Sequence, residues 1–140
     1  MRFFRLNRNE RRLFLEAVYE TFVVFIITNV RSARKYTPLL GCSGAETEEV
    51  ELAPEKAEQA LRIKTAVARC RHLMWARKCL VVSFAAKRML GRQGIPATLY
   101  LGVAKDEKGK MIAHAWLRSG NIWVTGGRNR HRFTTVGFFS

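Results

Sequence analysis

The sequence is poor in cysteine, has almost no acidic residues in its second part, and contains no apolar run of membrane-spanning length. Its cysteines, Cys42, Cys70 and Cys79, are odd in number, which argues against a disulfide framework. Residues 1–4 do not begin a cleavable signal with a small-residue processing site. The longest apolar run, residues 22–27, lies in a stretch that Glu20 interrupts, short of the roughly 20 apolar residues that span a bilayer. We therefore expect a cytoplasmic protein whose thiols stay reduced.

Positive charge is concentrated in the second part of the chain. Twenty-five Lys and Arg residues oppose eleven Asp and Glu residues, a formal net charge of +14. Residues 1–58 carry nine basic and nine acidic side chains, whereas residues 59–140 carry sixteen basic side chains against only Asp106 and Glu107. Such a surface attracts anions, so the candidate partners are nucleic acid, acidic lipid headgroups, or an acidic peptide or protein.

Length and composition predict one folded domain. A chain of 140 residues can bury roughly two-thirds of its unfolded surface in a single core. A hydrophobic content of 48%, with nine Phe and three Trp, excludes a disordered chain. Within this domain we expect residues 1–53 to form an N-terminal helix and an acidic loop, and residues 54–140 to form the core.

Helical patterns come first along the chain and strand patterns second. Apolar spacing predicts helices over residues 9–31, over 54–74, and from Cys79 to a stop at 91–94, with Asn9 as the first N-cap. Residues 37–53 predict a flexible, solvated loop, and residues 75–78 a short break. Strands are predicted at 97–103, 111–118 and 122–125, and more weakly at 132–136. This order favours an α+β fold with a small antiparallel sheet.

The first predicted helix has an unusual apolar segment. Residues 22–27 are apolar on every side of the helix, which indicates burial in the core, contact with a partner protein, or weak peripheral contact with a membrane. Arg31, Arg34 and Lys35 follow, where a helix C-terminus favours cations.

Cys79 is the cysteine best placed for nucleophilic chemistry. It follows Arg77 and Lys78 and opens a predicted helix, so unpaired backbone N–H groups and nearby cations would stabilise a thiolate. Cys70 lies within a predicted helix and Cys42 in a Gly-Ser loop, where inert side chains are expected.

A histidine on a predicted strand could act with this thiol. His114 lies in an apolar segment between two alanines, which leave its ring room to reach a neighbour. Taken alone, such a residue is usually structural. His72 and His131 lie beside arginines and are expected at the surface. A Cys at a helix start followed about 35 residues later by a strand His is the arrangement of papain-like and transglutaminase-like proteins.

The motifs around these two residues resemble those of one family. Residues 79–105, including Gly94-Ile95-Pro96-Ala97 and Leu101-Gly102-Val103, together with Ala113-His114-Ala115-Trp116, closely resemble the leader peptidases of lasso peptide biosynthesis. These peptidases belong to the transglutaminase-like superfamily. The resemblance covers residues 54–126 well, includes Trp75, and covers the first helix more loosely.

The resemblance implies a cysteine protease that cuts a ribosomal precursor between leader and core peptide, after which a partner cyclase closes the ring. By motif, Cys79 matches the nucleophile and His114 the general base. In single-domain relatives a separate small protein binds the leader and delivers it, and this chain has the length of such a relative. No cofactor is implied.

One position departs from the family pattern. Several relatives place a triad Asp on the strand after the histidine, where this sequence has Gly126, and no carboxylate follows Glu107. Asn121, Thr125, a backbone carbonyl or water could orient the His114 ring instead. For the oxyanion we expect the Cys79 backbone N–H as a donor, with the Trp75 indole N–H as a second candidate.

Two other functions are compatible with parts of the sequence. A nucleic-acid-binding module without catalytic activity would explain the charge and the basic residues near aromatics, among them Arg128, Arg130 and Trp123. In a protease the same three residues would contact the peptide or a partner.

A zinc site is disfavoured, because Cys70 and His72 have no second closely spaced pair of ligands. A nucleotide site is not indicated either, because Gly126-Gly127 matches no phosphate-binding loop.

Overall fold

The computed structural model describes residues 5–140, so the expectation about residues 1–4 lies outside the described part. Four helices come first: α1 (Arg8–Val30), α2 (Ala33–Tyr36), α3 (Pro54–Arg69) and α4 (Cys79–Arg92). Four strands follow: β1 (Thr98–Lys105), β2 (Met111–Ser119), β3 (Ile122–Thr125) and β4 (Thr134–Phe139). Short 3₁₀ segments are η2 (Thr37–Leu40), η3 (Cys70–His72), η4 (Met74–Ala76) and η5 (Gly127–Arg132). The predicted α+β fold is confirmed.

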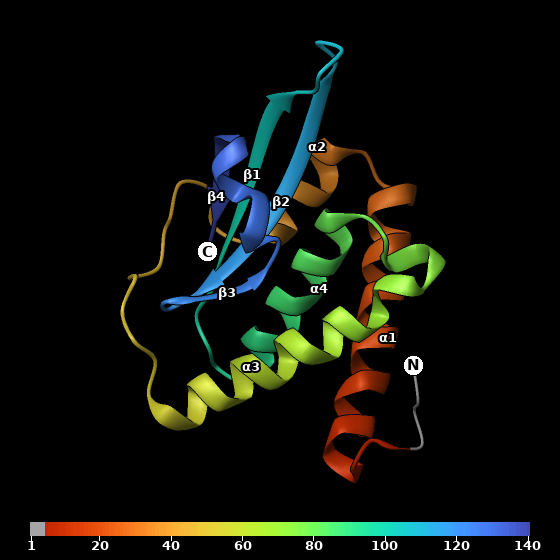
Figure 1. The fold of residues 1–140 in the computed structure, drawn as a ribbon, viewed down its shortest axis with the longest axis vertical. Coiled ribbons are helices and arrows are strands. Elements are labelled where there is room, and N and C mark those ends of the chain that lie inside the picture. Colours follow the sequence, from red (N-terminus) through yellow and green to blue (C-terminus); the bar gives the residue numbers. More distant parts are fainter. Residues whose placement is uncertain (1–4) are drawn as a thin grey trace.

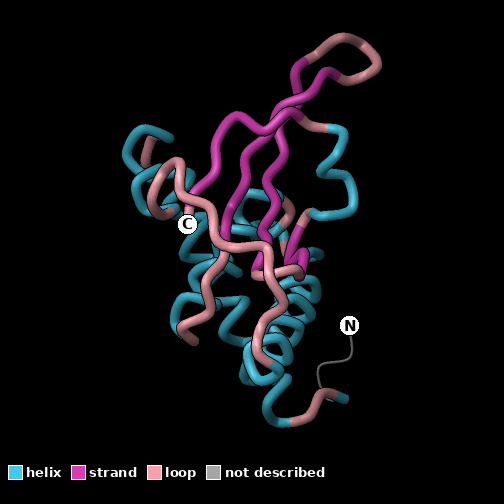
Figure 2. The backbone as a smooth tube through the Cα atoms, turned by 90° about the vertical axis from the view of Figure 1, so that its left-hand side faces the viewer, coloured by secondary structure: helices cyan, strands magenta, loops and turns pink. Residues whose placement is uncertain are grey.

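The strands form one antiparallel sheet against which α4 packs. Their order is β3-β2-β1-β4, so the two longest strands lie in the centre. Figure 1 shows α4 between this sheet and the pair α1 and α3, and Figure 2 shows the strands running side by side above the helices. α4 is accordingly the most buried helix, and its Phe84, Met89 and Leu90 join Leu99 of β1 and Leu117 of β2 in the core.

Helix boundaries differ from the prediction where capping and packing decide them. The N-cap of α1 is Asn7 and not Asn9, because the Asn7 side chain accepts from the Glu10 backbone N–H while the Glu10 carboxylate accepts from the Asn7 N–H. α1 ends at Val30, so Arg34 lies in the separate α2. α3 ends at Arg69 instead of residue 74, and two 3₁₀ turns lead from it to α4.

The strand predictions are right in number and shifted at the ends. β3 has the predicted bounds, whereas β1 and β4 begin one and two residues later than predicted and extend further. β4 pairs with β1 as the sheet edge and carries a register shift opposite Leu101 and Gly102. Glycine is needed at residue 102, because a Cβ there would lie 2.7 Å from the Trp116 ring.

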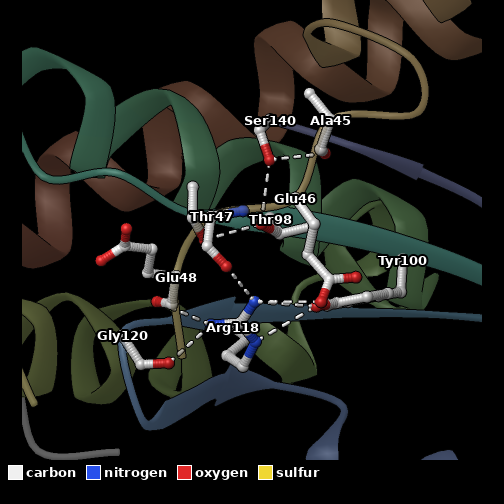
Figure 3. A network of polar contacts seen from close by, with 9 residues as sticks. All are labelled: Ala45, Glu46, Thr47, Glu48, Thr98, Tyr100, Arg118, Gly120 and Ser140. Carbon is white, nitrogen blue, oxygen red and sulfur yellow. Dashed lines mark hydrogen bonds and ion pairs between the residues drawn. The ribbon is translucent and has the colours of Figure 1, made fainter. Parts of the chain in front are cut away.

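The acidic segment before α3 is held against the sheet, which corrects the expectation of a flexible, solvated loop. Arg118 of β2 is only 1% exposed, and its guanidinium donates to the carbonyl oxygens of Thr47, Glu48 and Gly120 and to the Tyr100 hydroxyl (Figure 3). One buried cation thereby connects the loop to two strands.

A second set of polar contacts closes the end of the same loop. The backbone N–H and hydroxyl of Thr47 both meet the Thr98 hydroxyl, which in turn contacts Ser140 (Figure 3). The Ser140 hydroxyl donates to the Ala45 carbonyl at 2.8 Å. The last described residue and the acidic loop are therefore joined at the start of β1.

α1 presents two contrasting faces. Its inner face buries Ala17, Val24 and the fully buried Glu20, whose carboxylate pairs with Arg88 and Arg92 of α4. Its outer face exposes five large apolar residues at helical spacing, namely Leu15, Tyr19, Phe22, Ile26 and Val30, here called the outer stripe.

An 18-residue window of α1 has a mean hydropathy of 1.7 and is 22% buried, so α1 is long and apolar enough to cross a membrane by length and composition. That corrects the sequence-based estimate, which considered residues 17–30 alone.

Candidate active site

Cys79 is the first residue of α4, as predicted. Lys78 precedes it as N-cap in an extended conformation and makes no side-chain cap hydrogen bond, so no side chain caps the N–H groups of the first turn. Such N–H groups carry the positive end of the helix dipole and stabilise anions beside them. The thiol is half-buried, so it is partly shielded from bulk water and still accessible to a substrate.

The Cys79 thiol lies against the strand that carries His114. The backbone N–H of Ala115 donates to Cys79 Sγ at 3.3 Å. This N–H is available because β3 pairs with β2 only from Leu117 to Ser119, which leaves the edge of β2 open beside Ala115. The thiol is thereby held beside the segment of β2 that carries His114.

The His114 ring is fixed by a backbone carbonyl and two aromatic rings. His114 Nε2 lies 2.9 Å from the Gly126 carbonyl oxygen, and the ring stacks on Trp116 and packs against Phe133 at centroid distances of 5.6 and 4.9 Å. A carbonyl oxygen can only accept, so a neutral ring keeps its proton on Nε2. Nδ1 is then the unprotonated nitrogen, the one able to take a proton.

Cys79 and His114 are adjacent through the backbone and not through a direct bond. Within residues 5–140 no hydrogen bond joins the Cys79 thiol to the His114 ring, and Nδ1 has no hydrogen-bond partner. The thiol contacts the N–H of the peptide that follows His114, which places the two groups at the same point of β2.

The position that holds an acid in several relatives holds a carbonyl here. Gly126 has a left-handed φ of 65°, and this turn at the end of β3 directs its carbonyl oxygen to His114. The two predicted orienting side chains are placed elsewhere: Asn121 is exposed at the β2–β3 turn, and the Thr125 hydroxyl contacts Ser83 at 2.6 Å. Of the alternatives considered from the sequence, the structure has the backbone carbonyl.

Thr125 and Ser83 together hold the Gly126 turn close to α4. Ser83 lies one helical turn after Cys79, so both side chains project from the same face of the helix, one to β2 and the other to the end of β3. Sequence reasoning did not identify Ser83. The feature of the sequence that could have identified Ser83 is its i+4 spacing from Cys79.

The Trp75 side chain contacts α1 and makes no hydrogen bond to the Cys79 thiol within residues 5–140. Its indole N–H donates to Thr21 Oγ1 of α1 at 3.1 Å, and its ring meets Phe22 edge-on at 5.5 Å. Since that N–H is already used, the Cys79 backbone N–H remains as the candidate oxyanion donor of the two that the sequence suggested.

The other cysteines and histidines lie outside this site. Cys70 is fully buried, and burial raises the pKa of its thiol to about 11, which keeps it protonated at neutral pH. Cys42, His72 and His131 are exposed. In the described part of the chain no three His, Cys, Asp or Glu side chains gather as a metal site would require.

An open groove of about 790 Å³ is lined by His114 together with residues of α3, η3, α4, β3 and η5. The three predicted contact residues, Trp123, Arg128 and Arg130, line it from β3 and η5. Lys64 and Arg71, which sequence reasoning did not single out, line it from α3 and η3. Residues far apart in the sequence therefore meet beside the candidate base.

Restoring an acid at residue 126 is expected to harm the site. A Cβ on Gly126 would lie 2.5 Å from the Ala115 carbonyl oxygen and 3.0 Å from His114 Nε2, and the backbone is left-handed. Because displacement of a catalytic group by about 1 Å costs about a hundredfold, Gly126→Asp should lower kcat/KM of any reaction that uses His114 by about 10- to 100-fold. Gly109→Ala is the matched control, with φ 76° and open space around its Cβ. A rise in kcat/KM for Gly126→Asp would contradict the role of the carbonyl.

One protein family matches most of this chain. No curated protein and no solved structure has a significant match to it. A family model described as the transglutaminase-like superfamily matches residues 23–137, which include α3, α4, strands β1 to β3 and most of β4, with Cys79, His114 and Gly126. This chain therefore belongs to the transglutaminase-like superfamily.

Proposed function

We propose that this protein is a cysteine peptidase that removes the leader peptide from a lasso peptide precursor before a partner cyclase closes the ring. The observation that carries the proposal is the junction of α4 and β2, where the Cys79 thiol meets the Ala115 N–H and the preceding His114 is held through Nε2 by Gly126. The superfamily often uses a cysteine and a histidine in hydrolysis. The motif resemblance over residues 79–116 supports the narrower substrate.

Acylation begins with a proton transfer between these two residues. His114 Nδ1 takes the thiol proton of Cys79, and the sulfur attacks the scissile carbonyl carbon to form a C–S bond. The carbonyl oxygen becomes an oxyanion, which the backbone N–H of Cys79 stabilises at the start of α4. The imidazolium then gives its proton to the leaving amine, the C–N bond breaks, and an acyl-enzyme remains.

Deacylation uses the same histidine as the base for water. His114 takes a proton from water, the hydroxide attacks the thioester, the C–S bond breaks to release a carboxylic acid, and the imidazolium returns its proton to the departing sulfur. Through both half-reactions the Gly126 carbonyl keeps the proton on Nε2 and stabilises the imidazolium by accepting its N–H, although it lacks the full negative charge of an Asp.

The experiment is cleavage of the precursor peptide together with its leader-binding protein. Mass spectrometry of the products should find one cut between leader and core, and release of the core should be required for ring closure by the cyclase. An intact precursor after incubation of folded wild-type protein with that partner would refute the proposal.

The outer stripe of α1 supports a separate proposal about location. We propose that it lies on an anionic membrane surface, because its five exposed apolar side chains are flanked by exposed Arg8 and Arg12 at one end and Arg31 and Arg34 at the other. Glu20 points inward to α4, so the stripe can meet lipid without unpairing that carboxylate.

Vesicle co-sedimentation tests the role of the stripe. Replacing Ile26 and Val30 together by serine should weaken binding to anionic vesicles by about 30-fold, since each side chain loses about 1 kcal/mol of partial apolar burial. The control replaces Met111 and Val136, each 64% exposed on the sheet, by serine. Equal binding of the two double variants would show that the stripe does not meet lipid.

A further inference from the structure

Four basic residues from two parts of the chain line the groove beside His114. Lys64 and Arg71 come from α3 and η3, and Arg128 and Arg130 come from η5. No Asp or Glu is among the described residues that line it. Within residues 5–140 none of these four cations forms an ion pair, whereas Arg62, Arg88, Arg92 and Arg118 all do.

One of these cations is held in place. The Arg130 guanidinium carbon lies 4.0 Å from the centroid of the Trp123 ring, and its Nη1 donates to the Gly127 carbonyl at 2.5 Å. A guanidinium fixed by stacking loses less side-chain entropy on binding than a free one, and its remaining N–H groups can pair with a carboxylate.

The floor of the groove suits an extended peptide. Val67, Ala68, Val82 and Val124 are apolar or small, and Gly126 and Gly127 add no side chains beside the ring of His114. A chain lying here can place a backbone carbonyl near the reacting groups and its side chains near the cations. Stacking of bases is disfavoured, because Arg130 covers the ring of Trp123, which leaves no free aromatic platform.

We infer that this groove is a substrate subsite that recognises an acidic side chain within a few residues of the scissile bond. The inference rests on the proposed peptidase function and adds the substrate class: peptides with Asp or Glu near the cut. Four cations around one groove, without a lining Asp or Glu, give it a positive potential that favours a carboxylate.

Matched peptides and matched variants test this subsite. The substrates are precursor-derived peptides with Asp or Glu placed before or after the scissile bond, each compared with its Asn or Gln counterpart at about 50 mM and 300 mM salt. For the wild type we expect the acidic peptide to show a KM about tenfold lower at low salt, on at least one side of the bond, with kcat little changed.

The groove variant is Lys64→Gln, Arg71→Gln and Arg128→Gln, three exposed residues that form no ion pair within residues 5–140. Its KM for the acidic peptide should rise to its KM for the amide peptide, so that the roughly tenfold preference for acid is lost. The control is Lys105→Gln, Lys108→Gln and Lys110→Gln on the β1–β2 hairpin, at the opposite end of the molecule from α3 (Figure 1), with the same change of charge. It should keep the preference.

The outcomes separate the inference from the proposed function. Equal KM values for acidic and amide peptides, or an unchanged preference in the groove variant, would overturn the subsite while leaving the peptidase intact. Failure of wild type to cleave any of the peptides or the precursor would instead refute the peptidase function. A single-stranded oligonucleotide that displaces the acidic peptide at equal concentration and physiological salt would assign the groove to nucleic acid.

Discussion

Cys79→Ala is expected to lower the rate of precursor cleavage by about 10⁴-fold or more, because it removes the atom that forms the acyl-enzyme. His114→Ala should lower kcat by about 10²- to 10⁴-fold through loss of the group that moves the proton in both half-reactions. The double variant should be little worse than Cys79→Ala alone, since residues that act as a unit are not additive. Single-turnover assays with mass spectrometry measure these rates.

The other two cysteines supply the controls. Cys42→Ala should retain wild-type cleavage, because Cys42 is exposed in the loop before α3. Alkylation at neutral pH should spare Cys70, whose pKa is raised to about 11 by burial, and prior alkylation of Cys79 alone should stop cleavage. Undiminished cleavage by folded Cys79→Ala or His114→Ala would remove the residue concerned from the mechanism.

Arg118→Met should lower the free energy of unfolding by about 3–5 kcal/mol. Methionine keeps part of the volume but leaves the carbonyl oxygens of Thr47, Glu48 and Gly120 without their buried donor. Exchanging a whole buried ion pair for apolar residues can be neutral, but here the acceptors are backbone groups that the substitution does not remove. Urea denaturation measures the change.

An exposed arginine provides the comparison. Arg62 forms an i,i+4 pair with Glu58 on α3, and its side chain is 48% exposed, so Arg62→Met should cost no more than about 0.5 kcal/mol. In Arg118→Met the loop over residues 45–53 should also exchange its amide hydrogens faster, because its attachment to β2 is lost. A loss below 1 kcal/mol in Arg118→Met would show that the network contributes little.

Local signals were sufficient for much of the fold. Pro54 opens α3, Cys79 opens α4, and the turn after Ser119 separates β2 from β3, as spacing and turn chemistry predicted. The errors lie where several local solutions compete, as at Asn7 against Asn9, where the carboxylate of Glu10 selects the cap. The burial of Arg118 was not predictable, because it depends on carbonyl groups about 70 residues away in the sequence.

The sequence by itself determined the residue types and their positions on elements: a cysteine at a helix start, a histidine on a strand, and a basic second part of the chain. The tertiary structure decided which groups meet. It directs the Gly126 carbonyl to His114, engages the Trp75 indole N–H with Thr21, and brings Lys64 and Arg71 into one groove with Arg128 and Arg130. Helix caps and strand turns depend on neighbours a few residues away, whereas these contacts arise only when α3, α4 and the sheet pack together and every buried polar group must find a partner.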